Sequence, residues 1–501
     1  MNFLVGLVLI LTIFYFIIQK KDGKVNSNIP GPKGFPILGN LLSMKGDLHL
    51  RLQEWYKQYG PIYRIRMGNV ETVVLTEYPI IREAFIGNSN SFINRFQRRS
   101  RLKINNGQNL VIVNGDIHNR LKTMVLSEMT SLRIKKYESS FIDNEIKKLF
   151  KVFDEYAKSG EPIILNNYIK MFSMNIVLCF TFGLNYSYPY GDYEKASEFI
   201  KLMVDYFNIA GQPILSDFIP SLEPLIDTSN YINTFKRIFN YTSELIRKFK
   251  IENEITNDNS NTNIEDKPIL SKLLQSFEKG EISWDSVVGT CIDLQVAGSD
   301  TSANTVLFCL LELINNPNIQ SKLYDNIKQA IIQKKEVEEE DQEEITISFN
   351  KYRTITPYLT MVVRETYRKY PTGTIGLPHV TSQDVELNGY KISAGTQIIQ
   401  NIWATHRNEK QFQDPDSFIP ERFIIDQQQS TTNSNLIHFG CGVRDCIGKS
   451  LADSEIFTML ASLINRYEFI NPQPLSPLND IGKFGITYTC PENKIIIKKR
   501  L

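Results

Sequence analysis

Cysteine and histidine are scarce in this chain: its 501 residues include six cysteines and five histidines. So few of them exclude a disulfide scaffold or an array of zinc fingers. A charge excess is also lacking, because 56 Lys and Arg against 55 Asp and Glu leave a formal net charge of +1. A chain built mainly to coat nucleic acid would be strongly basic, so we expect no nucleic-acid partner. Any metal chemistry must rest on one or two well-placed side chains.

Disorder and strong domain boundaries are absent as well. Hydrophobic residues make up 42% and charged residues 22% of the chain, close to the averages of globular proteins. The length alone suggests about three domains, yet no boundary after Leu48 is strong enough to divide the chain.

One long uncharged apolar run is present, at residues 3–18, and Lys20, Lys21 and Lys24 follow it. A full membrane span needs about 20 residues, although thinner bilayers tolerate shorter ones. A cleaved signal peptide is the alternative, but the run has no basic region before it and no small-residue cleavage site after it. Because positive charge tends to stay on the cytoplasmic side, we predict an uncleaved anchor, residues 1–20, with the body in the cytosol.

Residues 21–40 combine Lys21 and Lys24 with a dense run of proline and glycine that begins at Ile29-Pro30-Gly31-Pro32. Such a run gives a stiff, extended, non-helical connector. It would hold a soluble body at a set angle to a membrane, although an ordinary linker explains it equally well.

Most of the remaining chain has the periodicity of amphipathic helices. The helical segments are 121–150, 168–182, 197–207, 231–250 and 451–467. The strand patterns are 62–67, 72–75, 397–399 and 494–497. Polar stretches at 252–266, 336–344 and 427–435 are predicted to be surface loops. The pattern predicts a mainly helical body with small sheets near both ends.

One predicted helix, Ser283 to Asn315, differs from the others because it is apolar on nearly every face. With Ser283 as its N-cap and Pro317 after its end, it should run roughly 50 Å through the core. Its middle reads Ala297-Gly298-Ser299-Asp300-Thr301-Ser302. Glycine costs about 1 kcal/mol inside a helix, and a buried unpaired Asp is costly. These residues indicate a ligand site, but a packing glycine and a paired Asp explain them equally well.

The most informative stretch is the loop from Phe439 to Gly448, FGCGVRDCIG. A helix predicted to begin near Ile447 places Cys446 at its N-terminus, where the helix dipole would lower the thiol pKa. Such a cysteine could be a nucleophile, a metal ligand or a haem ligand. The loop lacks the ligand spacing of a zinc site and has Asp445 where a dinucleotide fingerprint needs glycine. Reducing equivalents would therefore have to come from elsewhere.

The pattern F-x-x-G-x-R-x-C-x-G of this loop resembles the haem-binding loop of the cytochrome P-450 family. Further motifs of the family precede this loop in the chain, in the family's order. Ala297 to Ser302 is similar to A-G-x-D-T-S, Glu365-Thr366-Tyr367-Arg368 to E-x-x-R, and Pro420-Glu421-Arg422-Phe423 to P-E-R-F. The anchor and hinge resemble those of microsomal members. The resemblance spans essentially the whole chain. It implies the P-450 fold: mainly α with small β-sheets, a single large domain at 41–501, and an N-terminal transmembrane helix.

The resemblance implies haem b (iron protoporphyrin IX) as cofactor, with Cys446 as the axial thiolate ligand of its iron. Such a thiolate favours cleavage of the O–O bond. Thr301 and Asp300 are then the expected catalytic residues, because Thr301 can hydrogen-bond dioxygen and Asp300 can relay protons from solvent. Ala297 and Gly298 would leave room for oxygen beside the helix.

The chain departs from the family where a haem propionate is usually held. Family members usually carry W-x-x-x-R after a glycine and an acidic residue, whereas Gly115-Asp116 leads here to His118 and Lys122. Lysine lacks the bidentate fork of arginine, and Arg120 is an alternative donor. Besides Cys446, the cofactor-binding residues implied by the resemblance are Arg444, His118, Lys122, His379, Phe439, Gly448, Ala297 and Gly298.

Glu365 and Arg368 lie three residues apart, a spacing worth only about 0.2–0.5 kcal/mol on a helix surface. The resemblance places them with Arg422 in a buried ion network behind the haem. Breaking one partner of such a network should cost several kcal/mol. We therefore interpret these three residues as structural.

We expect a haem-thiolate monooxygenase that inserts one atom of dioxygen into a lipophilic small molecule. Its electron donor would be an NADPH-cytochrome reductase, with a cytochrome b-type donor as a further partner. Membrane lipid would be a partner of the anchor, and the expected location is the endoplasmic reticulum membrane, single-pass, with the catalytic domain facing the cytosol.

Two alternative functions are considered. One is a haem-thiolate isomerase or dehydratase that needs no reductase, and the Asp300–Thr301 pair argues against it. The other is a haem sensor or carrier without turnover.

By family analogy, segments near 96–113, 207–218, 372–375 and 484–487 line the substrate pocket.

Overall fold

The computed structural model describes residues 28–44, 46–184, 201–203, 205–207, 209, 214–256, 268–338, 346–424 and 435–500. The predicted anchor at 1–20 and the first part of the hinge lie outside these residues, as do most of the polar stretches at 252–266, 336–344 and 427–435. Within the described ranges, no helix is both long enough and apolar enough to span a bilayer.

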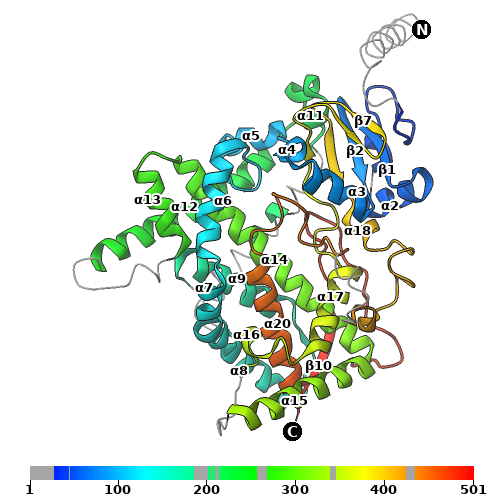
Figure 1. Cartoon of the computed structure of the whole chain (residues 1–501). Helices are drawn as coiled ribbons and strands as arrows, with labels where there is room; N and C mark the ends of the chain where they lie inside the picture. The colour runs from blue at the N-terminus through cyan, green and yellow to red at the C-terminus, as the bar shows by residue number, and fades with distance from the viewer. Residues whose placement is uncertain are drawn as a thin grey trace, which may run out of the picture.

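The largest sheet joins segments from both halves of the chain (Figure 1). Its strand order is β1 (Ile62–Met67), β2 (Val70–Leu75), β8 (Gln397–Gln400), β5 (His379–Val380) and β3 (Asn94–Arg95). The pairing of β2 with β8 is parallel and places Thr72 opposite Gln397. Two sheet regions that the sequence placed near opposite ends of the body therefore form one sheet.

Two smaller sheets complete the β-structure of the described residues. One has the order β4 (Ile163–Ile164), β10 (Lys494–Lys499), β9 (Tyr467–Ile470), and the other pairs β6 (Val385–Leu387) with β7 (Tyr390–Ile392). The strands predicted at 62–67, 72–75, 397–399 and 494–497 are all confirmed, within two residues at each end.

Helices make up most of the rest. The α-helices are α2 (Leu48–Tyr59), α3 (Tyr78–Arg82), α4 (Ser89–Phe92), α5 (Arg99–Asn105), α6 (Gly115–Glu128), α7 (Ser131–Tyr137), α8 (Asp143–Ser159), α9 (Asn166–Phe182), α11 (Leu215–Phe218), α12 (Ser229–Thr256), α13 (Ile269–Glu278), α14 (Trp284–Asn315), α15 (Pro317–Glu338), α16 (Phe349–Tyr352), α17 (Pro357–Lys369), α18 (Ile402–Thr405) and α20 (Lys449–Arg466). Of the predicted segment 197–207, the described residues 201–203 and 205–207 are helical. The short helices are η1 (Leu41–Met44), η2 (Glu83–Gly87), η3 (Glu138–Ile142), η4 (Pro220–Leu225) and η6 (Pro420–Phe423).

Helix α14 runs through the middle of the molecule, with α9 and α20 packed along it (Figure 1). Ser283 is its N-cap, and the hydroxyl oxygen of Ser283 accepts a hydrogen bond of 3.1 Å from the N–H of Ser286. Of its 32 residues, 25 are buried. The predicted core helix is confirmed, with the cap where the sequence placed it.

The predicted helix at 121–150 is wrong as one continuous element. Helix α6 ends at Glu128, and α7, η3 and α8 follow in its place. Thr130 caps the new start, since its hydroxyl oxygen accepts from the N–H of Arg133 at 3.4 Å. Apolar residues continue at helical spacing across this break, which is why periodicity alone missed it.

Candidate active site

A cavity of about 340 Å³ lies between the middle of α14 and the loop before α20. Ala297, Gly298 and Thr301 line it from α14, and Cys446 lines it from the loop. Of the other predicted cofactor-binding residues, it is lined by Arg444, His118, Lys122, His379, Phe439 and Gly448. The fold thus gathers motifs from four separate parts of the chain around one space.

The cysteine loop is a tight turn built on glycine. Gly440 and Gly442 have φ values of +77° and +82°, a left-handed conformation that disfavours residues with a side chain. A Cβ on Gly442 would also lie 2.1 Å from the carbonyl oxygen of Phe85. The N–H of Cys446 donates to the carbonyl of Phe439 at 2.7 Å, which closes the turn. Cys446 is thereby exposed toward the cavity.

The sequence predicted a lowered pKa for Cys446 at a helix N-terminus, but the net effect of its surroundings is to raise this pKa. Helix α20 begins at Lys449 with Gly448 as its N-cap, so Cys446 lies outside the first turn. Burial by surrounding protein raises the pKa of the Cys446 thiol, and the backbone N–H of Gly448 lowers it only in part.

Arg95, which the sequence analysis did not identify, lies at the same cavity. Its Nη1 donates to the carbonyl of Leu377 at 2.8 Å, and its Nη2 donates to the carbonyl of Arg444 at 3.2 Å. Nη1 also contacts Nε2 of His379. Burial, reinforced by the charge of Arg444, lowers the pKa of Arg95 to about 9, so it remains a cation at neutral pH.

His379 is held by a backbone carbonyl and contacts Arg95. Its Nδ1 lies 2.6 Å from the carbonyl of Phe92, to which it donates, and its Nε2 is then the acceptor that faces Arg95. Burial and then the charge of Arg95 lower the pKa of His379 to about 2, so the ring is neutral. His379 therefore orients Arg95, although its ring also lines the cavity.

The remaining basic residues are held in different ways. Arg444 donates from Nε to the carbonyl of Ile93 at 3.1 Å and from Nη2 to that of Val113 at 2.6 Å. Burial and the charge of Arg444 lower the pKa of His118 to about 4. Lys122 donates to the carbonyl of Val443, so it joins α6 to the cysteine loop.

These residues fit haem b. The Nε atom of Arg95 is buried without a hydrogen-bond partner, and the charge that acts on Arg95 is a second cation, Arg444. The described residues give this guanidinium pair no carboxylate partner within 4 Å. Two neighbouring cations at a cavity wall suit a ligand that carries carboxylates. The propionates of haem are such groups, and the thiol of Cys446 lines the same cavity.

Thr301 and Asp300 point to different surroundings. The Thr301 hydroxyl lines the cavity and donates to the carbonyl of Ala297 at 2.7 Å. Asp300 is buried: its Oδ1 lies 3.0 Å from Nζ of Lys170 on α9, and its Oδ2 accepts from the hydroxyl of Thr487 at 2.5 Å.

The middle of α14 was predicted to be either a ligand site or a packing glycine with a paired Asp. Both interpretations apply, but to different residues. A Cβ on Gly298 would lie 2.6 Å from Cγ2 of Val177, so this glycine lets α14 pack closely on α9. Asp300 is paired. Ala297 and Thr301 border the ligand cavity.

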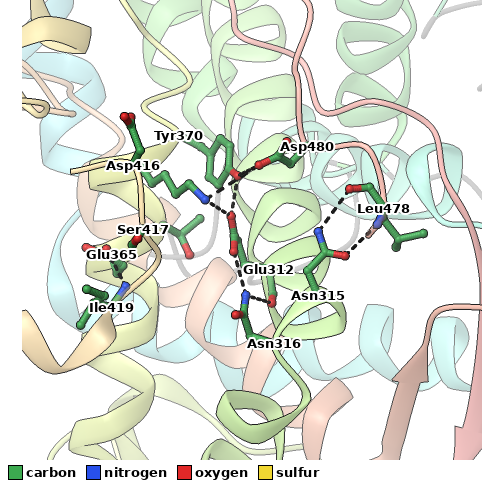
Figure 2. Close-up of polar contacts among 12 residues, drawn as sticks. Glu312, Asn315, Asn316, Glu365, Tyr370, Asp416, Ser417, Ile419, Leu478 and Asp480 are labelled. Carbon is green, nitrogen blue, oxygen red and sulfur yellow. Dashed lines mark hydrogen bonds and ion pairs between the residues drawn. The ribbon is translucent and has the colours of Figure 1, made fainter. Parts of the chain in front are cut away.

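Glu365, Arg368 and Arg422 form the buried network that the resemblance implied. Glu365 and Arg368 are both fully buried, and their two salt-bridge hydrogen bonds measure 2.8 Å each. Arg422 Nε donates to Oε1 of Glu365 at 3.0 Å. The N–H of Ile419 donates to the same oxygen at 2.9 Å, as Figure 2 shows. None of the three residues lines the cavity, which agrees with a structural role.

The C-terminal loop is bound along α14. Asn315 and Leu478 exchange two hydrogen bonds, and Tyr370 lies between Glu312 and Asp480 (Figure 2). Further along, Asn304 Oδ1 accepts from the N–H of Cys490 at 2.9 Å.

Two of the four segments predicted to line the substrate pocket border the cavity. Leu110 and Val111 contribute from 96–113, and Thr372, Gly373 and Ile375 from 372–375. Residues of 484–487 and the described residues of 207–218 do not border the cavity. Phe484 stacks instead on His49, with ring centroids 5.0 Å apart.

Besides Arg95, the polar cavity residues that the sequence analysis missed include Asp293, Gln400 and Glu455. Gln400 on β8 is 3% exposed and its Oε1 has no partner in the described part of the chain. None of the three belongs to a recognisable motif. Only the helical spacing of Asp293 from Ala297 and Thr301 could have indicated a shared face.

Comparisons with known proteins agree with this site. The family model described as Cytochrome P450 matches residues 29–498. The chain is 81% identical to "Probable cytochrome P450 513A1" of Dictyostelium discoideum, over 100% of both chains. It is 49% identical to "Probable cytochrome P450 513A3" over 98% of each, and 45% identical to "Probable cytochrome P450 513E1" over 99% of each, both from the same organism.

Proposed function

The chain belongs to the cytochrome P450 family, and on that basis we propose a membrane-anchored enzyme that oxidises a lipophilic small molecule with electrons from an NADPH-cytochrome reductase. Family membership makes it an oxidoreductase, a haem-thiolate monooxygenase that uses haem b, dioxygen and a redox partner. The observation that supports the proposal most is the single cavity that joins Cys446, the cations Arg95 and Arg444, and Thr301.

Each of these groups has one task in the proposed reaction. When bound, haem supplies an iron centre at which dioxygen is reduced and cleaved. Cys446 would hold the iron through its sulfur, while Arg95 and Arg444 would hold the propionates. The Thr301 hydroxyl donates to the carbonyl of Ala297, so its oxygen has lone pairs free to accept a proton or a hydrogen bond from the cavity.

Asp300, the neighbour of Thr301 on α14, would bring protons to Thr301 from the side of α14 that packs on α9. Its partner Lys170 has a side chain that is 14% exposed, so the ion pair reaches toward solvent. Lys170 and Thr487 hold the carboxylate in place.

Replacing Thr301 with valine should uncouple electron consumption from product formation. The hydroxyl is lost at nearly constant size, so proton delivery fails while the cavity keeps its shape. We expect product formation to fall about tenfold or more, with a matching rise in hydrogen peroxide per NADPH consumed. Thr290→Val is the control, because Thr290 is buried on the same helix away from the cavity and its hydroxyl has no partner among the described residues. Unchanged coupling in Thr301→Val would refute the proton-relay role.

The proposed organisation is an anchor at 1–20, a hinge at 21–40 and a catalytic domain at 41–501, on the cytosolic face of the endoplasmic reticulum. Deleting residues 1–24 should move the protein from the membrane pellet to the supernatant and leave its haem spectrum unchanged. Sedimentation of both forms with membranes in high salt measures this. Persistent tight pelleting of the shortened protein would show that the body binds lipid by itself.

Oxygen labelling tests the proposed reaction directly. Spectral binding to a panel of sterols, fatty acids, terpenoids and polyketides selects a ligand, which is then incubated with reductase, NADPH and ¹⁸O₂. We expect a product that contains one labelled oxygen atom and that forms only with both reductant and oxygen. Conversion without reductant would identify an isomerase or dehydratase, and binding of haem without any conversion across the panel would favour a sensor.

A further inference from the structure

Glu455 is a carboxyl group in the cavity wall that has no task in the proposed reaction. It lies on α20, the helix that follows the cysteine loop, about 9 Å along the helix from its first residue, Lys449. Its side chain lines the cavity together with Cys446 and with Leu451, one turn earlier on α20. Glu455 is only 1% exposed. The carboxyl group thus borders the space that fits haem b while it is shielded from bulk solvent.

The closest polar neighbours of Glu455 are hydroxyl groups. Ser173 on α9 and Ser302 on α14 act on its carboxyl group, and α9 and α20 both pack along α14 (Figure 1). Oε1 of Glu455 has no hydrogen-bond partner in the described part of the chain. Among the same residues, no lysine, arginine or histidine forms an ion pair with Glu455. A carboxylate here would be buried without a compensating charge, which is costly.

Other titratable groups on the surrounding helices have partners of their own. Tyr367 on α17 faces Glu455, and its hydroxyl donates to Asp453 at 2.9 Å. Asp300 on α14 pairs with Lys170 of α9. The cations and histidines of the cavity wall described above share the cavity with Glu455. None of these groups supplies Glu455 with an ion pair within the described ranges.

Glu455 therefore holds a proton under ordinary conditions. Burial raises the pKa of Glu455 to about 8, although the hydroxyls of Ser173 and Ser302 act against this shift. An electron added to haem in the same cavity repels a carboxylate and favours the protonated acid. Inside a protein, two charges roughly 10 Å apart change an equilibrium constant by about tenfold.

We propose that Glu455 is a redox-linked proton site, which binds one proton from solvent as the haem iron gains one electron from the redox partner. The iron is reduced from ferric to ferrous, the carboxylate becomes a carboxylic acid, and the net charge of the cavity stays constant. The inference goes beyond the proposed function and is independent of the substrate. It predicts that a proton is loaded beside Ser302, the neighbour of Thr301, in the step that reduces the iron.

The sign of the pH dependence follows from this coupling. At low pH, Glu455 is neutral in both oxidation states, so the midpoint potential of the haem is high and constant. As pH rises above the pKa of the ferric enzyme, the carboxylate ionises and its charge opposes the added electron. The midpoint potential therefore falls until the pKa of the ferrous enzyme is passed. A carboxyl group that served only to tie α9, α14 and α20 together would not produce this fall.

Redox titration of the substrate-free, haem-loaded enzyme with mediators and optical detection tests the proposal. We expect the wild-type midpoint potential to fall by about 59 mV between about pH 8 and about pH 9, because a tenfold coupling equals that shift for a one-electron couple. Glu455→Gln has nearly the same shape but no proton to exchange. It should lose this fall and keep the low-pH potential of the wild type. Asp293, whose pKa burial raises to about 6, and the other cavity groups are present in both proteins, so the difference between them isolates Glu455.

Glu138→Gln is the matched control. Glu138 lies on η3, which packs against α20, and it accepts from the Thr458 hydroxyl at 3.2 Å. It is 1% exposed and burial raises its pKa as well, but it does not line the cavity. This variant should keep the wild-type fall. Glu455→Leu is a second neutral variant for the case that Glu455→Gln does not fold, and it should also lose the fall.

Infrared redox-difference spectra give an independent readout. Above about pH 8, reduction of the wild type should produce the C=O stretch of a newly protonated carboxyl group, and this band should be absent from the neutral variants at position 455. A wild-type potential without the fall, an equal fall in Glu455→Gln or Glu455→Leu, or a wild-type spectrum without the carboxyl band would overturn the proposal. These outcomes require an intact haem-thiolate spectrum but no substrate, so they are distinct from failure of the proposed function.

Discussion

Replacing Arg368 with leucine should lower the free energy of unfolding by about 3–5 kcal/mol, the usual cost of breaking a buried ion pair. Arg368 is fully buried, and its guanidinium makes two hydrogen bonds to Glu365. It also donates to the carbonyls of Pro415 at 2.7 Å, His406 at 3.1 Å and Ser417 at 3.1 Å. The variant would leave the carbonyls of Pro415 and His406 without this donor, while Arg422 would remain as a donor to Ser417 and as the remaining cation of the Glu365 carboxylate.

Arg51→Leu is the matched control. Arg51 and Glu54 have the same spacing of three residues on α2, but their side chains are 43% and 62% exposed. Solvent screens such a pair, so its loss should cost about 1 kcal/mol or less. Urea unfolding of the haem-loaded enzyme, followed by Soret absorbance and by fluorescence, measures both variants. Arg368→Lys keeps the charge without the planar fork and should lie between them. An Arg368→Leu variant no less stable than Arg51→Leu would contradict a structural role for the network.

The sequence correctly predicted those elements whose defining residues all lie within one short segment. The buried helix could be read from Ser283 to Asn315 because its cap, its terminating Pro317 and its unbroken apolar character lie within one segment. The cysteine loop was recognisable for the same reason, since Gly440 and Gly442 mark the turn that exposes Cys446.

Features that depend on tertiary contacts could not be predicted. Arg95 reaches the cavity because β3 pairs with β5, which places Arg95 opposite His379 in the sheet. Nothing in the residues around Arg95 indicates that pairing. The pKa of Cys446 likewise depends on how much protein surrounds the thiol, and burial outweighs the N–H of Gly448.

The break after α6 shows the limit of periodicity itself. Apolar positions continue in phase from Leu121 past Thr130, while the chain ends one helix and caps another. A threonine cap is a weak signal inside a periodic segment, and only packing decides whether it is used. The pocket segment predicted at 484–487 failed because tertiary contacts decide its direction: Thr487 binds Asp300 and does not line the cavity.

Replacing Cys446 with serine should abolish monooxygenase turnover. Cys446 is the thiol that the cysteine loop directs into the cavity, and a serine hydroxyl is far less acidic and does not supply the electron density that favours O–O cleavage. Cys441→Ser is the control, because Cys441 belongs to the same loop but does not line the cavity. Its variant should retain haem, spectrum and turnover.

The ferrous–CO difference spectrum of the purified wild-type, Cys446→Ser and Cys441→Ser proteins tests the central claim most directly. The account predicts the red-shifted Soret band of thiolate ligation in the wild type and in Cys441→Ser, and its loss in Cys446→Ser. A red-shifted band that survives in Cys446→Ser, or one that is absent from the wild type, would contradict it.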